Sequence, residues 1–122
     1  MNPTTERRIE ILPAEAVRQI TEVWDRWQRA ASVLSGIEIE CEALTIHLME
    51  TYGRPGMRKR LAAEIQTARC VAQNETMTRL VCAREQASPE DVAELEHAMA
   101  EERERYGLDG RPRLRLIRGG KA

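Results

Sequence analysis

The sequence between Leu12 and Tyr52 is LPAEAVRQITEVWDRWQRAASVLSGIEIECEALTIHLMETY. It contains no proline after Pro13 and a single glycine, Gly36. Its apolar residues recur at steps of three and four, which is the period of an amphipathic helix. We expect one long helix here, either continuous or broken once near Gly36. A continuous helix would be roughly 60 Å long, so it must pack against something of similar length.

The composition indicates a single helical domain with no strong overall field. The chain has 122 residues, of which 42% are hydrophobic and 32% charged, and it contains no phenylalanine. Its core must therefore be built from aliphatic side chains, alanine and methionine. Lys and Arg number 19 and Asp and Glu 20. This balance does not draw a protein to nucleic acid or to an anionic membrane, so such binding requires local clusters of charge.

Two features predict a cytoplasmic location. No apolar run reaches the length of about 18 residues that marks a transmembrane helix, and the first twelve residues lack the apolar segment of a signal peptide. The three cysteines, Cys41, Cys70 and Cys82, are odd in number and form no C-x-x-C pair. We expect reduced thiols and no zinc site.

A second long helix is predicted over residues 57–86. Residues 53–56, Gly-Arg-Pro-Gly, provide a glycine cap and a proline turn that end the preceding helix. Apolar residues then recur at helical spacing from Leu61 to Val81. Because the connection is short, we expect the two long helices to form an antiparallel hairpin.

The strongest local signal in the chain is Ser88-Pro89-Glu90-Asp91. Serine is a good N-cap, proline suits the first helical position, and two carboxylates complement the positive end of the helix dipole. The segment predicts a shorter third helix that ends at Tyr106, with Gly107 as its C-terminal cap.

The third helix and the C-terminal tail carry opposite charges. Residues 85–105 contain eight acidic residues and two arginines, whereas residues 108–122 contain five basic residues and one acidic residue. Residues 113–118 of the tail alternate as a short strand would, and so do residues 8–12. Three arrangements are open. The two ends pair as a small ribbon, the tail lies across the acidic helix, or a partner orders the tail.

Basic residues also gather at the start of the second helix. Positive charge at a helix N-terminus opposes the dipole, and such local conflicts are typical of functional sites. This cluster and the tail are candidate contacts for phosphates or for a partner protein. The candidate residues are Arg54, Arg58, Lys59, Arg60, Arg111, Arg113, Arg115 and Arg118.

Trp24 and Trp27 share one helix face with aliphatic neighbours. Such a face is usually core. However, the long first helix offers more apolar area than one hairpin covers, so we expect the two tryptophans to contribute to an interface with a partner or a second copy.

Signs of catalysis or metal binding are few. Glu94-x-x-His97 places a carboxylate and an imidazole on one helix face, and a metal centre built on it would need a second copy of the chain. Neither a nucleophile elbow nor a phosphate-binding loop is present. We expect no enzymatic activity, no cofactor, no metal and no small-molecule substrate.

The sequence therefore predicts an all-α protein. It would have an N-terminal arm (1–12), one helical domain (13–106) and a basic extended C-terminal tail (107–122). We expect a non-enzymatic interaction protein, a small subunit, adaptor or regulator, that oligomerises or docks to a partner protein, with the tail as an arm that the partner orders. The alternative is a nucleic-acid-binding protein that contacts phosphates through the basic loop and the tail.

Overall fold

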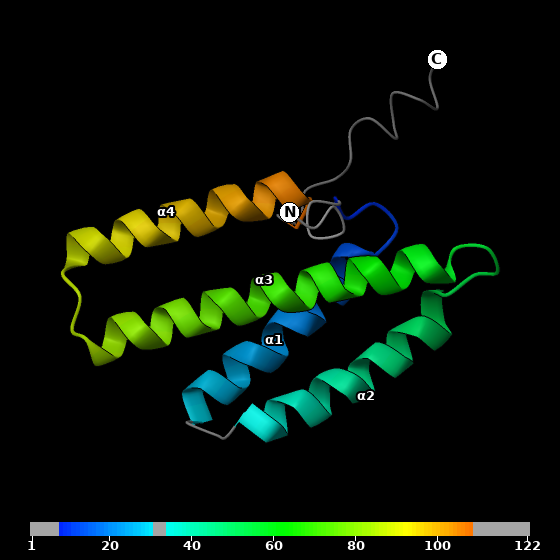
Figure 1. Cartoon of the computed structure of the whole chain (residues 1–122), viewed down its shortest axis with the longest axis horizontal. Helices are drawn as coiled ribbons and strands as arrows, with labels where there is room; N and C mark the ends of the chain where they lie inside the picture. The colour runs from blue at the N-terminus through cyan, green and yellow to red at the C-terminus, as the bar shows by residue number, and fades with distance from the viewer. Residues whose placement is uncertain (1–7, 31–33, 109–122) are drawn as a thin grey trace, which may run out of the picture.

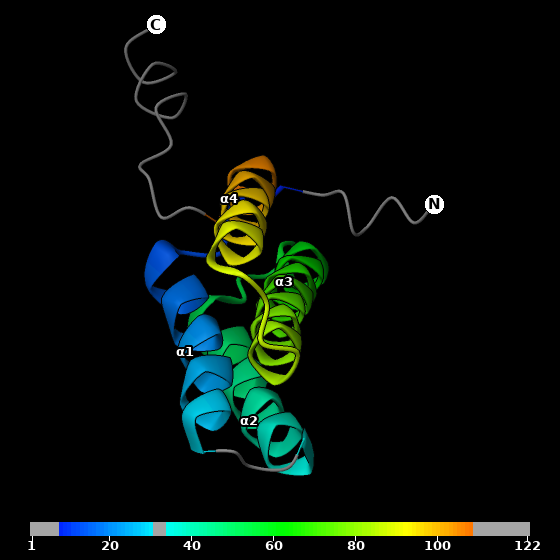
Figure 2. The same ribbon diagram turned by 90° about the vertical axis from the view of Figure 1, so that its left-hand side faces the viewer.

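The computed structural model describes residues 8–30 and 34–108, and this part of the chain is all-helical (Figure 1). It contains four helices and no strand: α1 (Ala14–Ala30), α2 (Leu34–Tyr52), α3 (Arg58–Arg84) and α4 (Pro89–Tyr106). α1 packs against both α2 and α3, α2 packs against α3, and α4 lies along α3 on the other side (Figures 1 and 2). The prediction of an all-α fold is confirmed.

The first of the two predicted alternatives, one continuous helix between Leu12 and Tyr52, is wrong. α1 ends at Ala30 and α2 begins at Leu34, so the break precedes Gly36, which lies inside α2. Gly36 instead allows a close approach, because a Cβ added there would lie 2.8 Å from the Trp27 ring. Two shorter helices that bury apolar faces against each other remove more apolar surface from water than one long rod would.

The core lies where α1, α2 and α3 meet. The predicted apolar stripes of these helices supply most of it, and α4 adds only Tyr106. The buried core residues include Val17, Ile20, Val23 and Trp24 of α1, Ile37, Cys41 and Leu48 of α2, and Leu61, Ile65, Ala68, Val71 and Ala72 of α3.

The caps predicted for the last helix are confirmed. The Ser88 hydroxyl accepts a hydrogen bond from the Asp91 N–H at 3.1 Å, and Pro89 is the first helical residue. Gly107 ends the helix with a left-handed φ of 79°. A Cβ on Gly107 would also lie 2.9 Å from the Ile9 carbonyl oxygen, so glycine is needed here for two reasons.

Residues 8–12 form no strand and pack against the helices. Ile9 is fully buried, and its N–H donates to the Tyr106 carbonyl at 2.7 Å. The alternation of apolar and charged residues at positions 8–12 therefore belongs to an irregular segment that packs on the helices, and not to a strand. The predicted ribbon with residues 113–118 lies outside the described residues.

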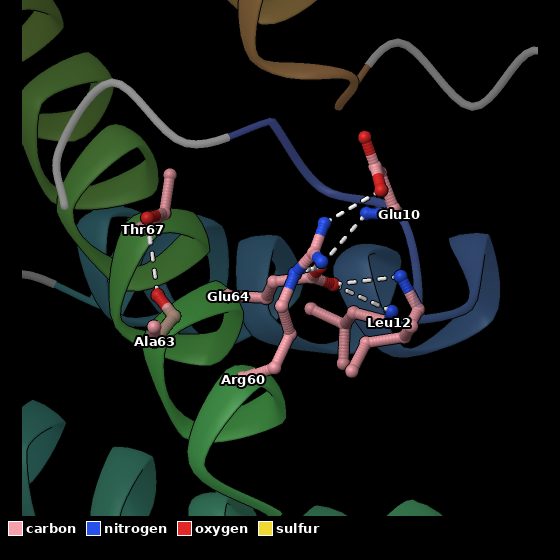
Figure 3. Close-up of polar contacts among 7 residues, drawn as sticks. Glu10, Leu12, Arg60, Ala63, Glu64 and Thr67 are labelled. Carbon is pink, nitrogen blue, oxygen red and sulfur yellow. Dashed lines mark hydrogen bonds and ion pairs between the residues drawn. The ribbon is translucent and has the colours of Figure 1, made fainter. Parts of the chain in front are cut away.

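Glu64 of α3 holds this segment in place (Figure 3). Its carboxylate is fully buried and accepts hydrogen bonds from the N–H groups of Glu10, Ile11 and Leu12 at 3.0, 2.9 and 2.8 Å. Arg60 Nε donates to the same carboxylate at 3.3 Å. A buried charge is tolerated only when it is paired and hydrogen-bonded, and Glu64 meets both conditions.

Glu75 of α3 anchors α4 in a similar way. Its carboxylate is only 3% exposed and accepts two hydrogen bonds from Arg103 of α4, at 2.6 and 2.9 Å. The Arg103 guanidinium also donates to the Thr21 hydroxyl at 2.9 Å and to the Leu108 carbonyl at 3.1 Å. One arginine thus ties α1, α3, α4 and the chain that follows α4 together.

Candidate functional site

Two residues of the predicted basic cluster have structural roles. Arg58 donates to the carbonyls of Met49 and Gly53 at 3.3 and 3.2 Å and so caps the end of α2. Arg60 contacts Glu10 at 2.6 Å in addition to Glu64, and the hydrogen bond to Glu10 raises the pKa of Arg60 above its ordinary value. These partners account for the positive charge at the start of α3.

The other predicted basic residues are placed differently. Arg54 and Lys59 are exposed near the α2–α3 connection, so they are the members of this cluster with most of their surface available to a partner. Arg111, Arg113, Arg115 and Arg118 lie outside the described residues. Of the predicted tail, Gly107 and Leu108 are described, and both are buried.

Both tryptophans have roles within the chain. Trp24 is 2% exposed and belongs to the core. Its buried indole N–H lies beside the Cys41 thiol of α2. Trp27 packs over Gly36, and its indole N–H donates to Glu40 of α2. Trp27 therefore joins α1 to α2, and a further role in an interface between proteins stays a prediction for this pair.

Glu94 and His97 lie on the exposed side of α4. His97 Nε2 is 3.3 Å from a carboxylate oxygen of Glu101, and both side chains are mostly exposed. Within residues 8–30 and 34–108, no three His, Cys, Asp or Glu side chains gather in a way that would hold a metal ion.

The outer parts of α3 and α4 form a feature that the sequence pattern did not indicate. We call residues 77–101 the α3–α4 arm. Figure 1 shows its end reaching past α1 and α2, and not one of its residues is buried. The arm nevertheless carries large apolar side chains, namely Met77, Leu80, Val81 and Leu95, which are 39–40% exposed.

A groove of about 370 Å³ runs between the two helices of this arm. Its walls are mainly apolar, and we call it the arm groove. It is lined by Thr78, Arg79, Cys82, Ala83, Gln86, Ala87, Val92, Leu95, Glu96 and Met99.

An ion pair between the two helices lines the arm groove. Arg79 of α3 and Glu96 of α4 form two hydrogen bonds, at 2.9 and 3.1 Å. This contact raises the pKa of Arg79 and lowers the pKa of Glu96. This ion pair links α3 to α4, two helices that make few other contacts with each other.

A second, more polar cavity of about 640 Å³ lies between α1, α3 and α4. Its arginines have partners: Arg18 pairs with Glu15 and Glu22, Arg79 with Glu96, and Arg103 with Glu75. Leu108 lies on one wall, and Arg79 lies on the boundary that this cavity shares with the arm groove. The two spaces therefore adjoin at Arg79 of α3.

α2 presents the most exposed apolar side chains of the described residues. Ile39 and Ile46 are 71% and 58% exposed, and their spacing of seven places them on one face. The cavities lined by described residues do not extend to them.

The described helices include none that is both long enough and apolar enough to cross a bilayer. Comparison with known proteins gives no assignment, because no family model matches the chain and neither a curated protein nor a solved structure matches it.

Proposed function

We propose that this protein is a non-enzymatic helical interaction protein, a small subunit, adaptor or regulator, and that the α3–α4 arm docks a partner protein. One observation carries the proposal. Residues 77–101 form the ends of two helices with an apolar groove between them and without a single buried residue. Exposed apolar grooves between helices are a common way to bind an apolar segment of another protein.

The charge of α4 indicates the chemistry of the partner. Residues 85–105 carry eight acidic residues against two arginines, and Glu96 of this segment lines the arm groove. Charge complementarity favours the right partner and rejects wrong ones. We therefore propose an apolar segment flanked by Lys or Arg as the occupant. The antiparallel hairpin predicted from the sequence, here α2 with α3, would be the rigid support of the arm.

A designed peptide tests this proposal without knowledge of the natural partner. It has about fifteen residues, with leucine at helical spacing and lysine elsewhere, and a second peptide replaces every lysine by glutamate. Fluorescence anisotropy measures binding to the purified full-length chain. We expect the lysine peptide to bind and the glutamate peptide not to bind.

Two variants then locate the binding site. Leu95→Glu places a charge in the arm groove, whereas Ile39→Glu makes a similar change on the exposed face of α2. We expect Leu95→Glu to weaken binding of the lysine peptide at least about tenfold and Ile39→Glu to leave it unchanged, with the helical circular dichroism of both variants intact. Equal binding of the two peptides, or equal effects of the two variants, would overturn the proposal.

The nucleic-acid alternative has less local support. Arg58 and Arg60 already hold backbone carbonyls and carboxylates, so that alternative would depend on Arg54, Lys59 and the tail. The nucleic-acid alternative predicts binding to duplex or single-stranded nucleic acid with an affinity that falls steeply as the salt concentration rises.

A further inference from the structure

We infer that two copies of this chain pair through the outer side of α3, antiparallel to each other about a two-fold axis. The surface consists of Ala63, Gln66, Cys70, Gln73, Asn74, Met77 and Val81, and we call it the outer stripe. None of these residues lines the arm groove. The inference therefore goes beyond the proposed docking role and does not depend on it.

The exposed surface of α3 carries no charge over most of the helix, although 32% of the chain is charged. The exposed residues between Leu61 and Ala83 are Ala62, Gln66, Gln73, Asn74, Met77, Leu80, Val81 and Ala83. The two arginines of this range, Arg69 and Arg79, are partly buried and paired with glutamates. Charged residues are depleted at the centres of protein interfaces, and in Figure 2 no described helix covers the right-hand side of α3.

The two halves of the outer stripe have different shapes. Positions 63, 70 and 77 are seven apart, as are 74 and 81, so they share one side of the helix. The first half lines a recess of about 560 Å³ between α3 and α4, together with Thr67, Val71, Glu102 and Tyr106. The second half carries Met77 and Val81, whose apolar side chains are each 39% exposed.

A recess beside protruding side chains makes this face complementary to a copy of itself. In a two-fold interface, residue i contacts residue j and j contacts i. An axis at Asn74 places Met77 of one copy opposite Val71 of the other, and Val81 opposite Thr67. Val71 and Thr67 both line the recess, so each copy fills the recess of the other. A parallel pair would instead place recess against recess.

The polar groups of the outer stripe also suit a second copy. A charged residue near a two-fold axis meets the same charge on the other copy, which weakens the pair. Gln73 and Asn74 instead carry amides, which donate and accept hydrogen bonds equally well. Of the described residues that line the recess, only Glu102 is charged, and the Asn74 amide of the second copy can donate to it.

The first experiment measures the association of the full-length chain by sedimentation equilibrium. We expect the native chain to form a dimer, and Asn74→Glu and Asn74→Lys each to weaken it at least about tenfold. An equimolar mixture of the two variants should restore the dimer, because opposite charges then meet at the axis. Ile39→Glu, on the exposed face of α2, is the matched control and should leave the dimer unchanged.

Asn74 is exposed, so we expect the helical circular dichroism of both variants to match that of the native chain. A native chain that stays monomeric up to about 1 mM, a dimer that Asn74→Glu does not weaken, or a mixture that stays monomeric would overturn the inference.

The second experiment tests the antiparallel orientation with the native Cys70. Met77→Cys is oxidised under mild conditions, and we expect a disulfide between residues 70 and 77, identified by mass spectrometry. Within one helix these positions are roughly 10 Å apart along the axis, too far for a disulfide, so the bond must join two chains. Ile39→Cys controls for random collisions and should give little crosslinked dimer.

The native chain gives the contrary result if the pair is parallel. An antiparallel pair separates the two Cys70 residues by eight helical positions, roughly 12 Å, whereas a parallel pair brings them together. A disulfide between the two Cys70 residues of a native dimer, or equal crosslinking yields for Met77→Cys and Ile39→Cys, would overturn the inference.

The outcomes separate this inference from the proposed function. A monomeric chain whose binding of the lysine peptide is weakened by Leu95→Glu would refute the inference alone. A dimer that forms the bond between residues 70 and 77, combined with peptide binding that Leu95→Glu does not weaken, would refute the docking role alone.

Discussion

The two ends of α3 differ although they belong to one helix. From Leu61 to Thr76 the helix contributes nine buried residues, while its last eight residues, 77–84, contribute none. Both parts carry large apolar side chains at helical spacing. The difference comes from their neighbours, because α1 and α2 cover the first part and the second part reaches past them (Figure 1). The same pattern therefore makes a core in one place and an exposed apolar surface in the other.

The buried carboxylate of the covered part should show the largest effect. Glu64→Ala leaves the N–H groups of residues 10–12 without their acceptor and Arg60 with one partner fewer. We expect a loss of about 4 kcal/mol in the free energy of unfolding, measured in urea. A loss below about 1 kcal/mol would mean that the hydrogen bonds to Glu64 contribute little to holding residues 8–12.

A pair of truncations compares the two ends directly. Ile65 is 1% exposed and Leu80 is 40% exposed. We expect Ile65→Ala to cost about 3 kcal/mol through the cavity it leaves, and Leu80→Ala to cost less than about 1 kcal/mol. Equal losses, measured by urea unfolding of both variants, would show that the arm is as well covered as the core.

Gly36 tests the contact between α1 and α2. A Cβ there meets the Trp27 ring at 2.8 Å, and this clash outweighs the better helix propensity of alanine. We expect Gly36→Ala to destabilise by about 1 kcal/mol. In a Trp27→Ala background the clash is absent, so the same change should stabilise instead, and thermal unfolding of the four proteins checks the change of sign. If Gly36→Ala changes the stability in the same direction in both backgrounds, the clash with Trp27 is not the cause of the change.

The ion pair of the arm should give the smallest effect. Arg79 lowers the pKa of Glu96, so the stability from this pair is present above the ordinary carboxyl pKa of 4.5 and is lost as the pH falls through the lowered value. The Glu96 side chain is 46% exposed, which limits the effect to about 0.5 kcal/mol. We expect urea unfolding between pH 6 and pH 3 to show a slightly smaller loss in Glu96→Gln than in the native chain.

Part of the candidate site was visible in the sequence and part was not. The acidic character of residues 85–105 and the opposite charge of the tail follow directly from composition. The structural roles of Arg58 and Arg60 do not, because their acceptors, the end of α2 and the carboxylates of Glu10 and Glu64, become neighbours only on folding. The exposure of Leu80 and Leu95 was equally invisible, since their spacing is that of core residues.

The sequence by itself determined the helical fold class, the start of α4 at Ser88 and Pro89, and its end at Gly107, because caps and periodicity depend on residues within a few positions of one another. Only the tertiary structure decided that α1 and α2 are separate helices, that Glu64 and Glu75 are buried, and that the α3–α4 arm is uncovered. Burial depends on which surfaces meet in space, and a one-dimensional pattern records which face of a helix is apolar but not what covers it.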